Sequence, residues 1–297
     1  MTRVLRLGRA PAKLNLALEL TGRRADGYHE LAAVSQTVDW SDVIALDGGA
    51  PDEPPVPAVP ELLVWGPEAH RVPLGPANLA VRAAILLREQ GLGTPLARLA
   101  LEKRIPTQSG LGGGSADAAA VLRMAGEGSD RGQLERIALE CGADVPFGLR
   151  GGACHLSGIG EVMSPLSPIR TGAFLIVVLG SVATGAAYAA TDPADFSDGS
   201  RVEQLANALR SGCPPDPGLF GSGLQPAALR AVPELIGRLR GLMEATPGVP
   251  WAMTGSGGAF FSYQPDGMAA AVLARAAAPA CPEAGIRVAL PLAAEAT

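Results

Sequence analysis

Apolar and polar residues alternate strictly over a short segment near the start of the chain. The leucines recur at every second position, as Leu14, Leu16, Leu18 and Leu20. This period predicts a half-buried strand. Lys13 and Asn15 then project together from its opposite face. We expect a returning strand over residues 31–38.

Further elements follow from the same patterns. Helical spacing predicts helices over residues 78–89, 115–125, 130–140, 201–210, 235–243 and 268–277. Strands are expected over residues 99–106, 174–179, 251–254, 259–263 and 286–290. In the first of these, Leu99, Leu101, Lys103 and Ile105 alternate with Ala100, Glu102 and Arg104. Helices and strands are mixed without regular βαβ alternation, which predicts the α+β class. The acidic, proline-rich residues 47–60 predict an exposed loop without chemistry.

Composition narrows the classes of protein to consider. The 297 residues suffice for about two domains. With 24 basic and 29 acidic side chains, the net charge of −5 argues against nucleic-acid partners and an anionic membrane surface. The longest apolar run, residues 173–179, is far short of the roughly 20 residues a bilayer requires. Arginines interrupt the N-terminal segment, so we expect no signal peptide and a cytoplasmic location.

Cysteines and histidines give no sign of a metal centre. The four cysteines form no C-x-x-C pair, and the three histidines stand singly. Neither a disulfide scaffold nor a zinc site is therefore expected. Buried small hydrophobic side chains are the simpler interpretation of the cysteines.

The most informative segment is a glycine-rich turn between a predicted strand and a predicted helix. Its residues are Pro106, Thr107, Gln108, Ser109, Gly110, Leu111, Gly112, Gly113, Gly114, Ser115 and Ala116. Missing Cβ atoms and the free amides of a helix start favour polyphosphate binding. No lysine follows the glycines and serine ends the run, so neither G-x-x-x-x-G-K-[ST] nor G-x-G-x-x-G is present. A merely flexible turn is the alternative.

The pattern Pro-x-x-x-Gly-Leu-Gly-Gly-Gly-Ser-x-Asp-Ala-Ala resembles the central motif of the GHMP kinases, which are ATP-dependent small-molecule kinases. Residues 10–16 resemble the first motif of that family and residues 253–259 the third. The resemblance implies a two-domain α+β fold. A ribosomal-protein-S5-like nucleotide domain would occupy residues 1–162, and a ferredoxin-like substrate domain residues 163–297.

Residues 22–29 and 141–147 are similar to those of one group within the family. This similarity implies transfer of the ATP γ-phosphoryl group to the 2-hydroxyl of a cytidine-diphosphate-linked methylerythritol, in non-mevalonate isoprenoid synthesis. ATP and Mg²⁺ would be required, by a monomer or homodimer. A GHMP kinase for another alcohol, such as a sugar or homoserine, and a non-catalytic nucleotide-binding protein remain alternatives.

The resemblance also assigns roles to residues. Asp144 matches the catalytic base, and Lys13 matches the lysine that stabilises charge at the acceptor hydroxyl. The residues implied to contact the substrate are Asn15, Tyr28, His29, Tyr188, Gly255, Ser256 and Gly257. By residue type alone, Asp144 would be a turn former and Lys13 a solvated strand residue. The sequence departs from the family pattern at Ala77, Gln108, Ser109, Ile159 and residues 222–224.

Overall fold

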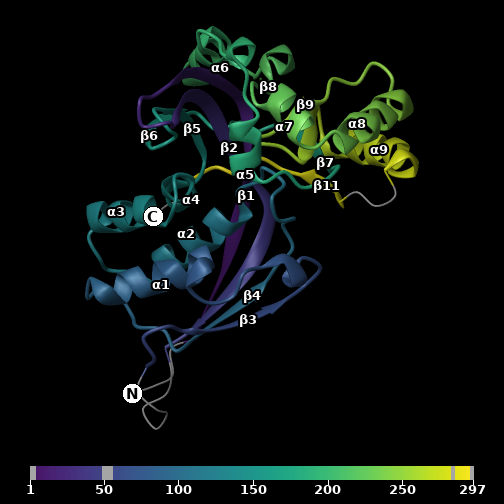
Figure 1. Cartoon of the computed structure of the whole chain (residues 1–297). Helices are drawn as coiled ribbons and strands as arrows, with labels where there is room; N and C mark the ends of the chain where they lie inside the picture. The colour runs from purple at the N-terminus through teal and green to yellow at the C-terminus, as the bar shows by residue number, and fades with distance from the viewer. Residues whose placement is uncertain (1–4, 49–55, 282–284, 295–297) are drawn as a thin grey trace. The chain divides into compact units, whose positions relative to one another are not determined.

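A computed structural model describes residues 5–48, 56–281 and 285–294. The chain folds into two compact units (Figure 1). Unit 1 comprises Met1–Ala12, Ser41–Thr107 and Gly112–Arg150, and unit 2 comprises Lys13–Trp40, Gln108–Leu111 and Gly151–Thr297. The long strands β1 (Leu5–Arg23) and β2 (His29–Asp47) each contribute residues to both units. A domain boundary between residues 162 and 163 stays a prediction.

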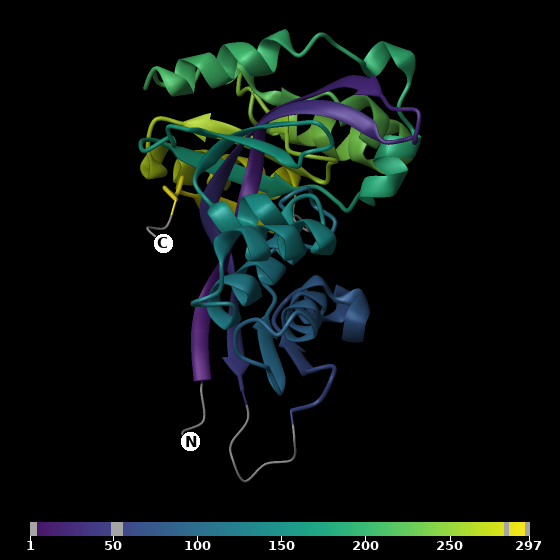
Figure 2. The same cartoon turned by 90° about the vertical axis from the view of Figure 1, so that its left-hand side faces the viewer.

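Unit 1 is a sheet covered on one face by helices (Figures 1 and 2). Its strands β3 (Glu61–Trp65) and β4 (Arg98–Glu102) continue the order β3-β4-β2-β1. Strand β4 is parallel to β3 and antiparallel to β2. The helices are α1 (Leu79–Glu89), α2 (Gly113–Ala125), α3 (Arg131–Cys141) and α4 (Val145–Arg150), with the short 3-10 helices η1 (Ala69–Arg71) and η2 (Gly75–Ala77) before α1.

Small side chains allow the helices of unit 1 to pack closely. Alanines fill most of the buried face of α2. A Cβ atom on Gly148 of α4 would lie 2.9 Å from the Cβ of Ala119 in α2. Asn78 caps α1, because its side-chain oxygen accepts a hydrogen bond from Ala80 N at 2.9 Å. The small side chains therefore let α2 and α4 approach each other closely, while Asn78 fixes the start of α1.

Unit 2 contains a four-stranded antiparallel sheet in the order β11-β7-β10-β9. Its strands are β7 (Ala173–Val178), β9 (Ala252–Met253), β10 (Ala259–Gln264) and β11 (Gly285–Ala289). Strand β5 (Ala153–Ser157) pairs with β2 and with β6 (Val162–Leu166), and β8 (Gly221–Ser222) pairs with β1. The rings of Phe174 and Phe261 meet edge to face in its core.

Helices and 3-10 turns complete unit 2. They are α5 (Thr184–Ala189), η3 (Pro193–Asp195), α6 (Ser200–Arg210), η4 (Pro217–Leu219), α7 (Gln225–Ala231), α8 (Glu234–Ala245), α9 (Gly267–Ala277) and η5 (Ala278–Ala280). In the described part of the chain, none of the helices has the length and apolarity needed to span a bilayer.

The six predicted helices and the predicted strands are present, with shifted ends. One interpretation was wrong: residues 13–20 are buried on both faces, not half-buried. Polar residues survive there because they have partners; the Glu19 carboxylate accepts hydrogen bonds from Val202 N and Ser197 Oγ, both at 2.8 Å. Periodicity missed the short or irregular elements β3, β5, β6, β8, α4, α5 and α7. Half of the predicted loop at residues 47–60, residues 49–55, lies outside the described residues.

Two predicted ends shift at the glycine-rich turn. The strand predicted to reach Pro106 ends at Glu102, because the N–H groups of Arg104 and Ile105 donate to the Asp42 carboxylate instead of to a neighbouring strand. The helix predicted to begin at Ser115 begins at Gly113, after Gly112 in the left-handed region at φ 69°.

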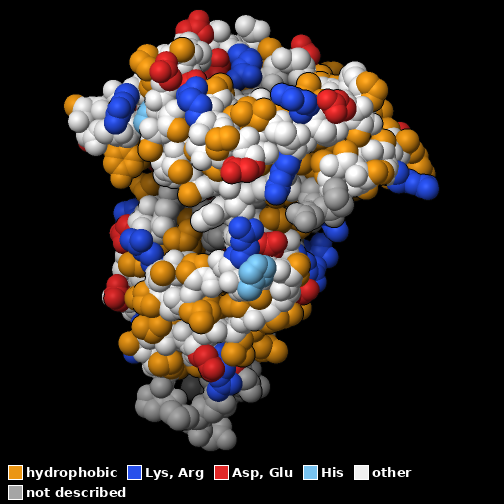
Figure 3. Space-filling view, turned by 45° about the vertical axis from the view of Figure 1, so that its right-hand side comes forward, with side chains coloured by type: hydrophobic (Ala, Val, Ile, Leu, Met, Phe, Trp, Pro, Cys, Tyr) orange, Lys and Arg blue, Asp and Glu red, His pale blue; other side chains and the backbone are white. Residues whose placement is uncertain are grey.

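On the face that Figure 3 shows, charged side chains of both signs are interspersed with apolar ones.

Candidate active site

In unit 2, β1 places Lys13 and Asn15 side by side, as their two-residue spacing predicts. Lys13 Nζ donates to Asn15 Oδ1 at 2.9 Å, and Asn15 Nδ2 donates to Ser35 Oγ of β2 at 2.8 Å. The backbone N–H of Asn15 donates to Thr254 Oγ1 at 2.8 Å. Both side chains are buried. The Asn15 side chain therefore holds the Lys13 ammonium in place, because its oxygen accepts from Lys13 while its nitrogen donates to Ser35.

The third motif forms the tight turn between β9 and β10. Gly255, Gly257 and Gly258 have φ values of 57°, 111° and 97°, which favour glycine. Ser222 Oγ donates to the carbonyl oxygen of Gly255 at 2.6 Å. The hydroxyls of Ser256 and Thr184 are 3.1 Å apart. The residues of this motif that are predicted to contact the substrate thus form a tight turn directly after Thr254. The sequence interpretation did not single out Thr254, which accepts the hydrogen bond from Asn15 N.

Residues 108–111 of the glycine-rich turn join the first and third motifs. The carbonyl of Leu111 accepts from Lys13 N at 3.0 Å, and that of Ser109 accepts from Ala259 N at 2.9 Å. A Cβ atom on Gly110 would lie 2.3 Å from the carbonyl oxygen of Thr254. Segments far apart in the sequence, all three carrying family motifs, therefore meet through main-chain contacts within unit 2.

Gln108 occupies a backbone conformation that suits glycine. Its φ is 55°, and among the described residues it is the one non-glycine residue with positive φ. The left-handed region costs an L-residue about 1–2 kcal/mol, which exceeds the roughly 0.5–1 kcal/mol that glycine loses through its more flexible unfolded chain. We expect Gln108→Gly to raise the free energy of unfolding by up to about 1 kcal/mol, measured by urea denaturation. Gln108→Ala keeps the Cβ atom, so a comparable gain in that variant would contradict the explanation.

The remaining loop residues belong to unit 1. Pro106 and Thr107 follow β4, and the N–H of Thr107 donates to Glu68 Oε2 at 3.3 Å. The first helical hydrogen bond of α2 runs from Ala116 N to the Gly112 carbonyl at 2.9 Å. The N–H groups of Gly113, Gly114 and Ser115 consequently have no acceptor within the helix. Such amides, together with the helix dipole, favour an anion at the start of α2.

The glycines of the loop are required for different reasons. Gly110 and Gly113 lie against protein atoms, and a Cβ on Gly113 would lie 3.0 Å from Lys103 Nζ. A Cβ on Gly114 would meet only Leu79 Cδ1, at 3.8 Å. The sequence interpretation explained all four glycines by the close approach of a ligand. That explanation does not hold for Gly110 and Gly113, because protein atoms occupy the space beside them. At Gly114, unlike at Gly110 and Gly113, an added Cβ would make only an ordinary van der Waals contact.

Asp144 lies in unit 1 between α3 and α4, half-buried. Its own carbonyl accepts from Gly148 N at 3.2 Å, and the preceding turn is closed by Val145 N donating to Gly142 O at 3.0 Å. These main-chain hydrogen bonds fix the backbone of the turn that carries Asp144 before a short helix. Lys13 belongs to unit 2, and the pairing of the two residues stays a prediction.

His29 lies among aromatic residues in unit 2. Its ring centroid is 5.2 Å from that of Tyr188, which is also predicted to contact the substrate, and 5.9 Å from that of Phe196, with which it is nearly parallel at 17°. Phe196 was not predicted, because no motif marks it and the contact depends on tertiary structure. The preceding residue, Tyr28, is 61 % exposed, so its ring is accessible to a flat ligand.

The hydrogen bonds of Thr191 define the state of the His29 ring. Thr191 Oγ1 donates to the Tyr188 carbonyl at 2.8 Å, so it accepts from His29 Nε2, which is 3.0 Å away. Burial, with a smaller effect of the Arg23 charge, lowers the pKa of His29 and favours the neutral ring. In a neutral imidazole with its hydrogen on Nε2, Nδ1 is a hydrogen-bond acceptor.

Comparison with known proteins identifies the family. Residues 78–152 match the N-terminal domain of the GHMP kinases. The 4-diphosphocytidyl-2-C-methyl-D-erythritol kinase of Verminephrobacter eiseniae is 35 % identical over 266 residues, covering 86 % of this chain and 84 % of the relative. The kinase of the same name from Xanthobacter autotrophicus is 37 % identical over 286 residues, covering 90 % and 92 %.

Solved structures agree with the relatives. A crystal structure of 4-(cytidine 5'-diphospho)-2C-methyl-D-erythritol kinase superposes with a TM-score of 0.72 at 34 % identity, over 96 % of this chain and 99 % of the other. Homoserine kinase from Cytophaga hutchinsonii shares the fold, with a TM-score of 0.69 at 18 % identity over 99 % and 96 %. The predicted α+β GHMP kinase fold is confirmed. The chain belongs to the GHMP kinases and, within them, to the family of 4-diphosphocytidyl-2-C-methyl-D-erythritol kinases.

Proposed function

We propose that the protein transfers the γ-phosphoryl group of ATP to the 2-hydroxyl of 4-(cytidine 5'-diphospho)-2-C-methyl-D-erythritol. The products are the 2-phosphate and ADP, in the non-mevalonate route to isoprenoids. The proposal rests on one observation. In unit 2, the hydrogen-bonded Lys13 and Asn15 contact both residues 108–111 and Thr254, which precedes the turn between β9 and β10. The names of relatives that match most of the chain support the choice of acceptor.

The loop from Pro106 to Ala116 is proposed to hold the ATP phosphates. The first-turn amides of α2, which have no acceptor within the helix, would bind the phosphate oxygens, and the hydroxyl of Ser115 adds a further polar group there. The space beside Gly114 fits the close approach of a phosphate to the main chain. Mg²⁺ would neutralise charge on the phosphates when bound, because this ion prefers phosphate and water oxygens to an all-protein cage.

The transfer itself is a displacement at phosphorus. Asp144 accepts the proton of the 2-hydroxyl, the hydroxyl oxygen forms a bond to the γ-phosphorus, and the bond from that phosphorus to the β-γ bridging oxygen breaks to release ADP. The Lys13 ammonium stabilises the negative charge that spreads over the phosphoryl oxygens. Asn15 keeps that ammonium in place through the 2.9 Å hydrogen bond to its Oδ1, and it contacts the acceptor.

Recognition of the cytosine is assigned to Tyr28, His29 and Tyr188. Stacking on tyrosine tolerates any base, so hydrogen bonding must select the cytosine. The acceptor at His29 Nδ1 suits the N4 amino group of cytosine and opposes the O4 carbonyl oxygen of uracil. We expect kcat/KM to fall about 10- to 100-fold when the uridine-linked analogue replaces the cytidine-linked substrate.

The test is an ADP-release assay with ATP, Mg²⁺ and each of four acceptors: the cytidyl substrate, its uridine analogue, homoserine and galactose. Rapid turnover of the cytidyl substrate alone would support the proposal. Equal or faster turnover of homoserine or galactose would overturn it in favour of a kinase for another alcohol. Tight ATP binding without product from any acceptor would instead indicate a non-catalytic nucleotide-binding protein. A cytoplasmic location and a monomeric or homodimeric state stay predictions.

A further inference from the structure

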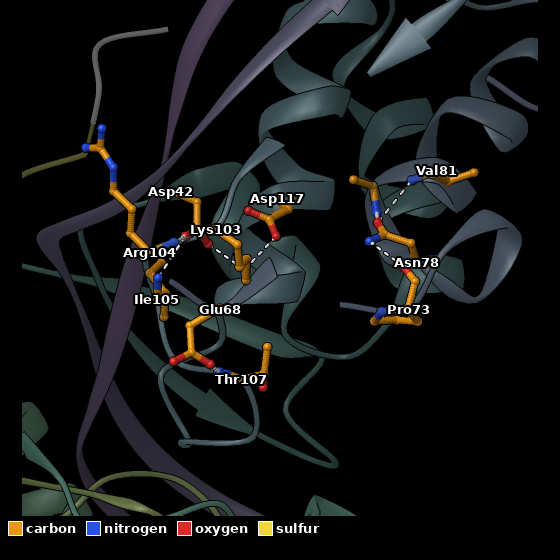
Figure 4. Close-up of polar contacts among 11 residues, drawn as sticks. Asp42, Glu68, Pro73, Asn78, Val81, Lys103, Arg104, Ile105, Thr107 and Asp117 are labelled. Atoms are coloured by element: carbon orange, nitrogen blue, oxygen red, sulfur yellow. Dashed lines mark hydrogen bonds and ion pairs between the residues drawn. The ribbon is translucent and has the colours of Figure 1, made fainter. Parts of the chain in front are cut away.

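A buried cluster of charged side chains lies in unit 1, apart from the residues assigned to the reaction (Figure 4). Lys103 Nζ is 2.5 Å from Asp42 Oδ2 and 2.7 Å from Asp117 Oδ2. All three side chains are at most 3 % exposed. We call Asp42, Lys103 and Asp117 the clasp. A buried charge is costly unless an opposite charge pairs with it. These three residues are therefore a buried ion-pair cluster and not a solvated surface network.

The clasp links the segments that precede and follow the glycine-rich loop. Lys103 directly follows β4, Asp117 lies in α2, and the proposed phosphate-binding residues 106–116 all fall between them in the sequence. At the entry to the loop, Asp42 Oδ1 accepts from the N–H groups of Arg104 and Ile105 at 2.6 and 2.8 Å. Figure 4 shows Lys103 between the two carboxylates, with Asp42 also binding this entry segment. The entry and exit of the loop thus depend on one ammonium group.

The ammonium of Lys103 also lies directly against the first turn of α2. A Cβ atom on Gly113 would approach Lys103 Nζ to 3.0 Å and Ile105 Cγ2 to 3.0 Å. Glycine at this position therefore leaves room for the lysine. The same first turn carries the amides proposed to bind phosphate, so a displacement of Lys103 would move or loosen those amides.

The charge of the clasp excludes direct attraction of the nucleotide. Two carboxylates against one ammonium leave no net positive charge to attract a phosphate. Burial raises the pKa of Asp117 to about 7, although the Lys103 ammonium opposes the rise. Asp117 Oδ1 has no hydrogen-bond partner among the described residues, so Lys103 is the group that compensates this carboxyl. The clasp can therefore affect nucleotide binding only through the positions of the segments that it joins.

We propose that Lys103 is a positioning residue for the phosphate-binding loop: by joining Asp42 to Asp117, it holds the first turn of α2 in the geometry that receives the ATP phosphates. This inference rests on the proposed function of the loop. A displacement of about 1 Å in such a site can cost up to 100-fold in rate. Loss of the clasp should therefore weaken ATP binding about tenfold or more, without changing the affinity for the cytidyl substrate.

The experiment compares three variants of the full chain. Lys103→Met keeps the length of the side chain and removes its charge. Lys103→Met combined with Asp117→Leu removes both the charge and the carboxyl left unpaired in the single variant, a replacement that buried pairs often tolerate. The control is Arg104→Met, which removes the neighbouring exposed ion pair with Glu102. Calorimetry measures the dissociation constants of AMP-PNP with Mg²⁺ and of the cytidyl substrate. Hydrogen exchange, without nucleotide, measures residues 116–119, the first amides of α2 that are hydrogen-bonded within the helix.

The proposal expects both Lys103 variants to bind AMP-PNP about tenfold more weakly and to exchange faster at residues 116–119, while the control matches the wild type. A folded double variant with wild-type AMP-PNP affinity and exchange would overturn it. Equal weakening for the cytidyl substrate would also overturn it, since that result indicates general loss of structure. If the wild type did not bind AMP-PNP, the proposed function would fail, and the exchange rates without nucleotide would still decide whether the clasp orders the loop.

Discussion

Replacing Asp144 with asparagine is expected to lower kcat about 1,000-fold, the largest single loss in this protein. The amide keeps the size and polarity of the side chain but cannot accept the proton of the acceptor hydroxyl. General-base catalysis contributes about 10²- to 10⁴-fold to such reactions. The KM values for ATP and the cytidyl substrate should change little, because the lost interaction belongs to the transition state. Steady-state ADP release at varied concentrations of both substrates provides the measurement.

The control for Asp144→Asn is Glu140→Gln. Glu140 is an exposed carboxylate in the last turn of α3, close to Asp144 in the sequence. Its replacement removes the same charge from the same region and should leave kcat within about twofold of the wild type. If Asp144→Asn kept a tenth or more of the wild-type kcat, Asp144 would orient the hydroxyl without taking its proton.

The sequence predicted the parts of the site that short motifs specify. The alternation at residues 13–20 placed Lys13 and Asn15 on one face, and their hydrogen bond confirms that they meet. It could not predict that the whole segment is buried. Burial of Glu19 depends on the N–H of Val202, which only the folded chain brings near. Local periodicity describes one strand, whereas burial depends on what covers both of its faces.

The clasp had a signal in the sequence that periodicity alone could not interpret. Lys103 falls in the same phase as Leu99, Leu101 and Ile105, so the alternation puts a charged residue on the apolar face of the strand. Such a residue requires a buried partner. Its partners come from β2 and α2, and no spacing rule connects Asp42 to Asp117. Phe196 beside His29 was missed for the same reason.

The glycines show a further limit of motif-based interpretation. A motif records that a Cβ atom is absent but not what that atom would have met. Gly110 and Gly114 lie four positions apart and look equivalent in the sequence. In the structure, a Cβ on Gly110 would collide with the main chain, whereas a Cβ on Gly114 would make only an ordinary van der Waals contact with Leu79 Cδ1, at 3.8 Å. The two alanine variants should therefore differ in kind.

Gly110→Ala is expected to lower the free energy of unfolding by about 2–4 kcal/mol. Its φ of 84° is unfavourable for alanine. The new Cβ atom would lie 2.3 Å from the Thr254 carbonyl oxygen and 3.2 Å from Gly257 N, so the main chain would have to move. Urea denaturation monitored by circular dichroism measures the loss. An unfolding free energy within about 0.5 kcal/mol of the wild type would show that this contact does not constrain the loop.

Gly114→Ala should have the opposite effect on stability and a separate effect on binding. Alanine is a better helix former than glycine, so the free energy of unfolding should rise by about 0.5 kcal/mol. The added methyl group would occupy the space proposed for a phosphate, and the dissociation constant of AMP-PNP with Mg²⁺ should rise at least tenfold. Because the variant is expected to be more stable, unfolding cannot explain that loss. Wild-type affinity in Gly114→Ala would contradict phosphate binding at the start of α2, whatever the stability of the variant.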